Sequence, residues 1–147
     1  MDFFSAMQIS SSALSAERTR MNLISSNLAN ANSTRTAEGG PYKRKDAVFA
    51  ATPAAEKFQA AMEKMRRGAS PAGVQVTQII EDQNPPRLQY DPSHPDANPQ
   101  GYVALPNVNV VEEMADMIAA TRAYEANVTA VQAAKSMALK TLELSTR

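Results

Sequence analysis

An apolar series that neither proline nor glycine interrupts runs along the last quarter of the chain and constrains the fold more than any other feature. Its members recur at alternating steps of four and three, the spacing that places side chains on one helix face against a partner helix. Asn109 is expected to cap this helix, and Glu112, three residues on, completes a variant of the capping box. A helix from Val110 to Leu144 would be about 50 Å long at 1.5 Å per residue. The series consists of Val110, Met114, Met117, Thr121, Tyr124, Val128, Val131, Lys135, Ala138 and Leu142.

Residues 3 to about 31 have a similar rhythm. Met7, Leu14, Met21 and Leu28 lie seven apart, and no proline or glycine intervenes. A second helix of roughly 40 Å is therefore predicted. It is expected to end in SNLANANSTRT, where Asn, Ser and Thr side chains compete for backbone hydrogen bonds and favour a turn.

The two terminal helices are expected to pair with each other in antiparallel orientation. A single amphipathic helix gains little stability from intrinsic propensity, so its apolar stripe must be buried. A pair still leaves much of each helix in water, and Val111, Ile118 and Leu139 beside the main series suggest a second contact surface for other molecules. The residues predicted for the helix seam and for subunit contacts are Met7, Leu14, Met21, Ile24, Leu28, Val110, Met114, Met117, Tyr124, Val128, Val131 and Leu142.

The segment between the helices has a different composition, because it contains all nine prolines and all five glycines. YKRKDAVFAA, GVQVTQII, RLQY and GYVAL are predicted strands, with the Pro-rich loop DPSHPDANPQ between the last two. EKFQAAMEKMRR, residues 56–67, is predicted to form a short helix. The expected fold class is α+β. Residues 1–35 would form a helix and turn, 36–107 a small β-rich and partly irregular insertion, and 108–147 the C-terminal helix.

The titratable residues give no sign of catalysis. Fifteen basic and fifteen acidic side chains balance, whereas nucleic-acid binding usually leaves a basic footprint. With one histidine and no cysteine, neither a typical zinc site nor a thiolate nucleophile is expected. His94 is interpreted as a surface-loop residue, Asp91 and Asp96 as turn residues that could also flank a cation, and the cluster Lys43 to Lys45 as solvated charge. We therefore expect no enzyme, no cofactor, no metal site and no small-molecule substrate.

The N-terminus, MDFFSAMQISSSALSAE, lacks the basic region and the continuous apolar region of a Sec-type signal peptide. No stretch approaches the roughly 18 consecutive apolar residues that a membrane span requires. The residues alone therefore favour a cytoplasmic protein, or an exported one that uses a different route.

Both ends of the chain resemble the bacterial flagellar axial proteins, the rod and hook group. LSAERTRMNLISSNLANANSTRT, residues 14–36, is similar to the family signature S-x-N-L-A-N-x-x-T, with one extra residue before the threonine. NVNVVEEMADMIAATRAYEANVTAVQAAKSMALKTLEL resembles the C-terminal signature of the group. YDPSHPDANPQGYVALPNVN resembles the linking stretch of one rod subfamily, with Asn98 where Asp is frequent. The signature residues carried over are Ser26, Asn27, Leu28, Ala29, Asn30, Asn107, Asn109, Glu112 and Glu113.

The resemblance implies a structural, non-enzymatic subunit of the flagellar proximal rod. In this family the terminal helices form an antiparallel coiled coil and line a hollow helical rod around a central export channel, which transmits motor torque to the distal rod, hook and filament. The implied partners are copies of the chain, rod subunits of the FlgB, FlgF, FlgG and FliE types, the flagellar type III export apparatus, and MS-ring or surrounding ring proteins. The implied location is the basal body, in the periplasm, reached by type III export without a cleaved signal peptide.

Alternatives stay open beside this interpretation. The nearest is another rod component of the FlgB or FlgF type, against which the HPDAN…GYV…PNVN linkage argues. A second is an amphipathic protein that binds membrane surfaces. Such helices carry Lys and Arg on the polar face, whereas residues 1–30 contain only Arg18 and Arg20 against Asp2 and Glu17. A third class, an enzyme with its site in the insertion, is supported by no residue.

Overall fold

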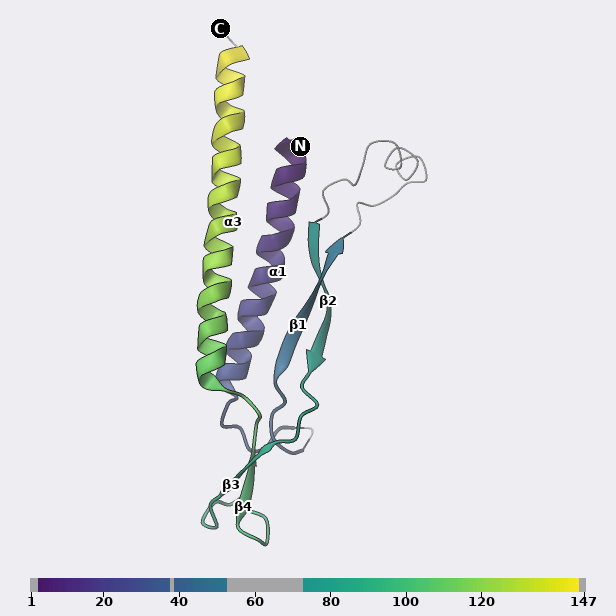
Figure 1. Ribbon diagram of the computed structural model, residues 1–147, viewed down its shortest axis with the longest axis vertical. Coiled ribbons are helices and arrows are strands. Elements are labelled where there is room, and N and C mark those ends of the chain that lie inside the picture. Colours follow the sequence, from purple (N-terminus) through teal and green to yellow (C-terminus); the bar gives the residue numbers. More distant parts are fainter. Residues whose placement is uncertain (1–2, 38, 53–72, 146–147) are drawn as a thin grey trace, which may run out of the picture. The chain divides into compact units, whose positions relative to one another are not determined.

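The computed structural model describes residues 3–37, 39–52 and 73–145 (Figure 1). Its elements, in order, are α1 (Phe3–Ala29), β1 (Lys45–Thr52), β2 (Gly73–Glu81), β3 (Arg87–Tyr90), β4 (Tyr102–Leu105) and α3 (Val110–Ser145). The predicted α+β class, with a long helix near each end and strands between them, is confirmed. The short helix predicted over residues 56–67 lies outside the described residues. None of the described helices combines the length and apolar character needed to cross a membrane.

α1 ends where side chains begin to replace helical hydrogen bonds. The Asn30 side-chain amide donates to the Ser26 carbonyl at 2.9 Å, and the Ser33 hydroxyl donates to the Asn30 side-chain oxygen at 3.2 Å. The Tyr42 backbone N–H then donates to the Ser33 carbonyl at 3.2 Å. These local bonds hold the turn that the Asn- and Ser-rich sequence predicts, and they stop the helix at Ala29.

α3 begins at the predicted cap. The Asn109 side-chain oxygen accepts the backbone N–H of Val111 at 3.1 Å, which is the bond of an N-cap residue. Glu112 and Glu113 lie in the first turn, where carboxylates interact favourably with the positive end of the helix dipole. The start of α3 is therefore fixed by residues within a few positions of it.

Four strands make two separate two-stranded sheets, one of β1 with β2 and one of β3 with β4. The Asp82 backbone N–H donates to the Arg44 carbonyl at 2.8 Å, and the Lys45 ammonium lies 3.4 Å from a Glu81 carboxylate oxygen. The beginning of β1 therefore lies beside the end of β2, so these strands run antiparallel.

The β3–β4 pair is antiparallel, with Tyr90 opposite Tyr102. Because side chains alternate between the faces of a strand, Val103 and Leu105 share one face, and both are buried. Leu88, Tyr90 and Tyr102 lie on the other face, and all three are exposed. On the inner face, β4 therefore contributes buried apolar side chains, whereas its partners Arg87 and Gln89 on β3 are polar and exposed; the outer face exposes large apolar side chains.

The described residues divide into two compact units. Unit 1 contains residues 3–19, 49–52, 73–77 and 121–145, and unit 2 contains residues 20–37, 39–48 and 78–120. Both long helices and the β1–β2 sheet contribute to each unit. The buried apolar side chains of unit 1 are Ala16 and Ala134, and those of unit 2 are Ile24, Ala31, Val103, Leu105, Pro106, Val108 and Ala120. Among the described residues, unit 2 therefore has the larger apolar core.

The start of β2 lies directly against α1 in unit 1. The Ser12 hydroxyl donates to the Ile9 carbonyl at 2.7 Å and accepts the Val74 backbone N–H at 3.0 Å. A Cβ atom at Gly73 would lie 2.8 Å from the Ser12 hydroxyl oxygen, so glycine allows the close approach. One helix serine thus holds this part of β2 against α1.

Candidate functional site

The end of α1, the beginning of β1 and the first turn of α3 meet in unit 2 around a buried amide and a buried carboxylate. Asn27 and Glu113 are each 1% exposed, and the Asn27 amide donates to a Glu113 carboxylate oxygen at 3.0 Å. We call Asn27, Tyr42, Arg44, Lys45 and Glu113 the polar junction. Since Asn27 and Glu113 belong to different terminal signatures, the junction joins the two ends of the chain.

Asn27 uses its full hydrogen-bonding capacity in the junction. Its amide also donates to the Lys45 carbonyl at 2.9 Å, while its oxygen accepts the Lys45 N–H and the Tyr42 hydroxyl, each at 2.9 Å. A side-chain amide offers two donors and an acceptor with two lone pairs, and all four are occupied here. The amide thereby bonds the Lys45 backbone as a neighbouring strand would, so an aspartate, which cannot donate when ionised, could not replace it.

Glu113 carries a charge that must be compensated inside the protein. A buried carboxylate is destabilising by several kcal/mol unless it is paired and hydrogen-bonded. One oxygen of Glu113 accepts from the Asn27 amide, and the other accepts from Arg44 Nε. The arginine and the asparagine together make this buried charge tolerable.

Arg44 extends the junction towards solvent. Its guanidinium lies 3.4 Å from an Asp46 oxygen and 3.9 Å from an Asp116 oxygen, and Asp116 lies 3.8 Å from the Arg20 guanidinium. Burial acts to lower the pKa of Arg44, but the hydrogen bond and charge of Glu113, followed by those of Asp46, outweigh it and raise that pKa above its ordinary value. Arg44 is therefore a permanent cation at this site.

Arg44 corrects the expectation that the Lys43 to Lys45 cluster is only solvated charge. Lys43 is exposed, but Arg44 neutralises a buried carboxylate and the Lys45 backbone binds Asn27. Tyr42 and Arg44 were not predicted as site residues. No periodicity links residue 44 to residue 113, so the only available signal was a basic cluster at the start of the predicted strand YKRKDAVFAA.

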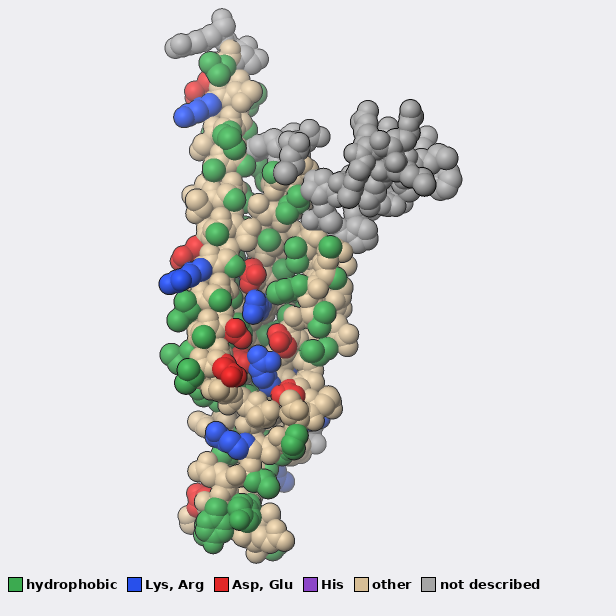
Figure 2. Space-filling view, in the orientation of Figure 1, with side chains coloured by type: hydrophobic (Ala, Val, Ile, Leu, Met, Phe, Trp, Pro, Cys, Tyr) green, Lys and Arg blue, Asp and Glu red, His purple; other side chains and the backbone are tan. Residues whose placement is uncertain are grey.

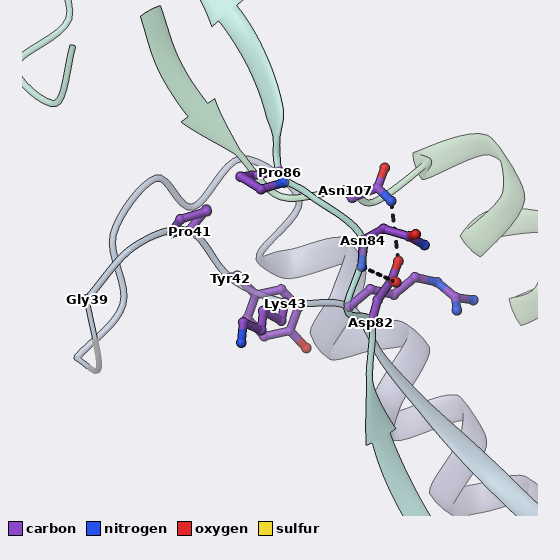
Figure 3. A pocket seen from close by; sticks show the side chains of 9 residues that line it. Gly39, Pro41, Tyr42, Lys43, Asp82, Asn84, Pro86 and Asn107 are labelled. Carbon is purple, nitrogen blue, oxygen red and sulfur yellow. Dashed lines mark hydrogen bonds between the residues drawn. The ribbon is translucent and has the colours of Figure 1, made fainter. Parts of the chain in front are cut away.

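A cavity of about 150 Å³ lies next to the junction in unit 2 (Figure 3). Asp82 holds two of its walls together. One carboxylate oxygen accepts the Asn84 backbone N–H at 2.9 Å, and the other accepts the Asn107 side-chain amide at 3.3 Å. The signature residue Asn107 thus ties the segment before α3 to the end of β2. The lining residues are Gly39, Pro41, Tyr42, Lys43, Arg44, Asp82, Asn84, Pro86 and Asn107.

The Pro-rich loop between β3 and β4 is held by its own side chains. An Asp91 oxygen accepts the Ser93 hydroxyl at 2.6 Å and the Ser93 N–H at 3.1 Å, and these hydrogen bonds lower the pKa of Asp91. The half-buried His94 accepts the Asp96 N–H at 3.1 Å, and Asp96 accepts the Thr34 hydroxyl at 2.8 Å. The bonds within the loop form turns, whereas the Thr34 bond ties the loop to the segment after α1. The described residues contain no cluster of three or more metal-binding side chains.

The predicted seam residues at the start of α3 share one face of the helix, but that face lies at the edge of the buried side and not at its centre. Met117 is half-buried, whereas Val110 and Met114 are exposed. The buried positions are Glu113 and Ala120, which follow the same four-and-three spacing displaced by one residue. The hydrogen bond from Asn27 to Glu113 places this side of α3 against α1, and Val110 and Met114 stay exposed beside it.

In unit 1, α1 and α3 share an open groove of about 520 Å³. The predicted seam residues Met7, Leu14 and Val131 line it together with Gln8 and Ser11. Of the remaining predicted seam residues, Ile24 is buried and Leu142 is exposed. The half-buried ones are Met21, Leu28, Tyr124 and Val128.

The other signature residues lie around the junction or at its edge. Ser26, Leu28 and Asn30 are half-buried, and the Ser26 hydroxyl lies 3.4 Å from the Tyr42 hydroxyl. The exposed members are Ala29, Asn107, Asn109 and Glu112. The signatures therefore contribute two buried junction residues, with the other members serving turns, caps and surface positions.

Large apolar side chains of α3 remain exposed in both units. Val111 is 74% exposed and Ile118 is 56% exposed in unit 2, and Leu144 is 77% exposed in unit 1. Leu139 and Leu142 are exposed as well. The exposure of Val111, Ile118 and Leu139 agrees with the second apolar stripe expected from the sequence.

Two family descriptions match the ends of the chain. "Flagella basal body rod protein" matches residues 7–35, and "Flagellar basal body rod FlgEFG protein C-terminal" matches residues 100–144. Asn27 falls in the first matched segment and Glu113 in the second. The buried hydrogen bond at the centre of the junction therefore joins the two segments that carry the family resemblance.

Three curated relatives are each called flagellar basal-body rod protein FlgC. The relative from Borreliella burgdorferi is 43% identical over 93% of both chains. That from Bacillus subtilis is 43% identical over 98% of this chain and 99% of its own, and that from Salmonella typhimurium is 40% identical over 98% of both. The chain therefore belongs to the FlgC family of flagellar basal-body rod proteins and is a structural subunit of the flagellar rod.

Proposed function

We propose that this rod subunit works through helix packing alone. In this proposal α1 and α3 pair as an antiparallel coiled coil, and their remaining apolar surface packs against neighbouring subunits in a helical wall around an export channel. The wall carries motor torque to the distal rod, hook and filament. No catalytic step, cofactor or small-molecule substrate is required.

The observation that carries the proposal is the row of large apolar side chains left exposed on α3. Val111, Ile118 and Leu144 are each more than half exposed, and exposed apolar side chains that gather into patches mark protein–protein contacts. Contacts between unlike surfaces that do not close into a ring generate open helical arrays. A rod subunit needs such contacts along much of its length.

The polar junction supports the same role, because it fixes how the two helices meet. Buried polar pairs cost stability, and their best-attested benefit is that they specify register between helices. Asn27 and Glu113 bond only when the end of α1 lies beside the first turn of α3. A fixed register would let each subunit present the same surface to its neighbours.

We infer that the partners are copies of the chain, rod subunits of the FlgB, FlgF, FlgG and FliE types, and the MS-ring or other rings around the rod. We also infer that the chain leaves the cytoplasm through the flagellar type III apparatus and assembles in the periplasm. Unit 1 buries few large side chains among its described residues. A segment with so little core can travel unfolded and gain order when it docks.

A charge in the half-buried part of α3 tests the packing role. Met117→Asp and Val128→Asp each place a carboxylate at a half-buried apolar position, which is strongly unfavourable. We expect loss of rod assembly and of swimming, scored in a strain whose own copy is deleted. Met117→Leu and Val128→Ile keep apolar side chains of similar size and should preserve swimming. Normal swimming with either aspartate variant would contradict the proposal.

Amide hydrogen exchange tests coupling between assembly and order. We expect backbone amides of residues 121–144 to exchange quickly in the purified monomer and slowly in isolated basal bodies, because neighbouring subunits would supply the missing apolar contacts. Equal protection in both states would mean that the helices form a self-sufficient domain. That result would remove the main support for the assembly role of α3.

A further inference from the structure

The methionines of the described residues differ in their exposure to solvent. Met114 is 54% exposed and Met137 is 63% exposed, whereas Met7, Met21 and Met117 are half-buried. Peroxides oxidise the sulfur of cysteine and methionine side chains, and the chain contains no cysteine. Met114 and Met137 therefore present the most accessible sulfur atoms in the part of the chain that the structure describes.

Met114 lies among apolar side chains on α3. Residues three and four positions away are the neighbours of a side chain on a helix surface, and for Met114 these are Val110, Val111, Met117 and Ile118. Val110, Val111 and Ile118 are exposed as well. Figure 2 shows hydrophobic side chains on the surface along α3. Met114 therefore belongs to the exposed apolar surface that the proposed function assigns to contacts with neighbouring subunits.

Met137 is at least as exposed as Met114 but has different neighbours. The residues three and four positions away are Ala133, Ala134, Lys140 and Thr141. The Lys140 ammonium forms no ion pair with the residues that the structure describes, so it is available to donate a hydrogen bond beside Met137. The four corresponding neighbours of Met114 are apolar and offer no side-chain donor.

We propose that Met114 is an oxidation site that controls whether a free subunit can join the rod. The oxidant is a peroxide, with hydrogen peroxide as the simplest case. The sulfur attacks one peroxide oxygen, an S–O bond forms as the O–O bond breaks, and the departing hydroxide takes the remaining proton and becomes water. The sulfur loses two electrons and the peroxide gains them. The product, methionine sulfoxide, is converted back by thiol-dependent reductases.

Oxidation changes Met114 from an apolar side chain to a polar one. Burying the sulfoxide oxygen without a hydrogen-bond donor is unfavourable, and the neighbouring side chains on α3 supply none. A subunit oxidised at Met114 should therefore dock poorly, whereas a sulfoxide at Met137 keeps Lys140 as a donor. The inference rests on the proposed function, because oxidation matters only if other subunits cover this surface, and it adds a reversible chemical control to that function.

Peptide mass spectrometry of the purified free chain in hydrogen peroxide tests the reactivity. We expect Met114 and Met137 to form sulfoxide about fivefold faster than Met117, because reactivity follows exposure. Met117 is a close internal control, since it lies three residues from Met114 on the same helix but is half-buried. Equal rates at Met114 and Met117 would contradict the assignment of Met114 as a preferred site.

Competition between two forms of the chain tests the effect on assembly. The native sequence and Met114→Leu, with different tags, are produced together in cells that lack the native copy and the reductases that repair methionine sulfoxide. The ratio of Met114→Leu to the native sequence is measured in isolated basal bodies and divided by the same ratio in whole cells. Hydrogen peroxide should raise this normalised ratio about fivefold, and its effects on other proteins cancel because both forms share one cell.

Met137→Leu is the matched control in the same competition. Its normalised ratio should change by less than about twofold in peroxide, because Lys140 can satisfy a sulfoxide at Met137. An equal rise for both variants would show that Met114 is not the controlling site. If the native form in whole cells carries the Met114 sulfoxide but Met114→Leu gains no advantage, the inference is wrong while the rod function stands. If neither form enters basal bodies even without peroxide, the proposed function fails and the inference fails with it.

Discussion

Both long helices contribute to unit 1 and to unit 2, yet the contacts inside unit 1 differ in kind from those inside unit 2. Unit 2 combines a buried apolar core with the polar junction, in which Asn27 makes four hydrogen bonds and Glu113 is paired on both oxygens. Among the described residues of unit 1, the buried apolar side chains are only alanines, Ala16 and Ala134. A single serine, Ser12, anchors the start of β2 there.

The difference indicates that the two parts of α3 have different roles. Geometry is specified where the polar junction allows one arrangement of α1, β1 and α3. The rest of α3 keeps large apolar residues such as Leu139 and Leu144 exposed, which suits surfaces that are completed by other subunits. One helix can therefore be fixed at its first turns and available for assembly beyond them.

The largest expected effect comes from leaving the buried carboxylate without its cation. Arg44→Met should lower the free energy of unfolding of unit 2 by about 3 kcal/mol, because Glu113 would keep an uncompensated charge. Urea titration followed by circular dichroism measures this loss. Lys43→Met is the matched control, since that neighbour is exposed and should change stability by less than about 0.5 kcal/mol. Equal effects of the two variants would show that the ion pair does not stabilise the junction.

A smaller loss is expected in unit 1 when the close approach of β2 to α1 is blocked. Gly73→Ala places a methyl group 2.8 Å from the Ser12 hydroxyl oxygen and should cost about 2 kcal/mol through overpacking. Adding Ser12→Ala removes that oxygen and should recover part of the loss. A double-mutant cycle in urea measures the coupling, and strictly additive effects would mean that the two residues do not meet.

Within the junction, removing a single donor should have a milder effect. Tyr42→Phe deletes the hydroxyl that donates to the Asn27 oxygen at 2.9 Å while the other three bonds of Asn27 remain. We expect a loss of about 1 kcal/mol, the usual net value of one hydrogen bond. The same unfolding assay measures this loss, with Tyr90→Phe as the control, because Tyr90 is exposed on the outer face of the β3–β4 sheet. A loss as large as that of Arg44→Met would mean that the tyrosine does more than complete the asparagine.

The smallest effect is expected in the loop outside both cores. Hydrogen bonds from Ser93 hold the pKa of Asp91 below its ordinary value. A depressed folded-state pKa adds stability above the unfolded-state pKa of about 3.9, and this contribution disappears as the pH falls through the lower folded-state value. The chemical shift of the Asp91 carboxyl carbon, followed by NMR as the pH is changed, should have a midpoint below the ordinary pKa of an aspartate. Ser93→Ala should move this midpoint upward. An unchanged midpoint in Ser93→Ala would reject the hydrogen bonds as the cause.

Local patterns predicted most of the secondary structure. The cap at Asn109, the turn after Ala29 and the alternating strand residues depend on neighbours a few positions away, so their effects can be read along the chain. The pairing of Arg44 with Glu113 could not be predicted this way, because 69 residues separate them. The four hydrogen bonds of Asn27 could not be predicted from the sequence either, although the N-terminal family signature includes this residue.

The sequence by itself determined where the helices begin and end, the α+β class and the resemblance to flagellar axial proteins. The tertiary structure decided which side of α3 lies against α1. An apolar series with helical spacing defines a stripe, but it does not set the rotation of the helix about its axis when a second stripe lies beside it. The hydrogen bond between Asn27 and Glu113, 86 residues apart, sets that rotation. A buried charge must be paired to be tolerated, and in the arrangement that pairs Glu113 the side chains of Val110 and Met114 stay exposed.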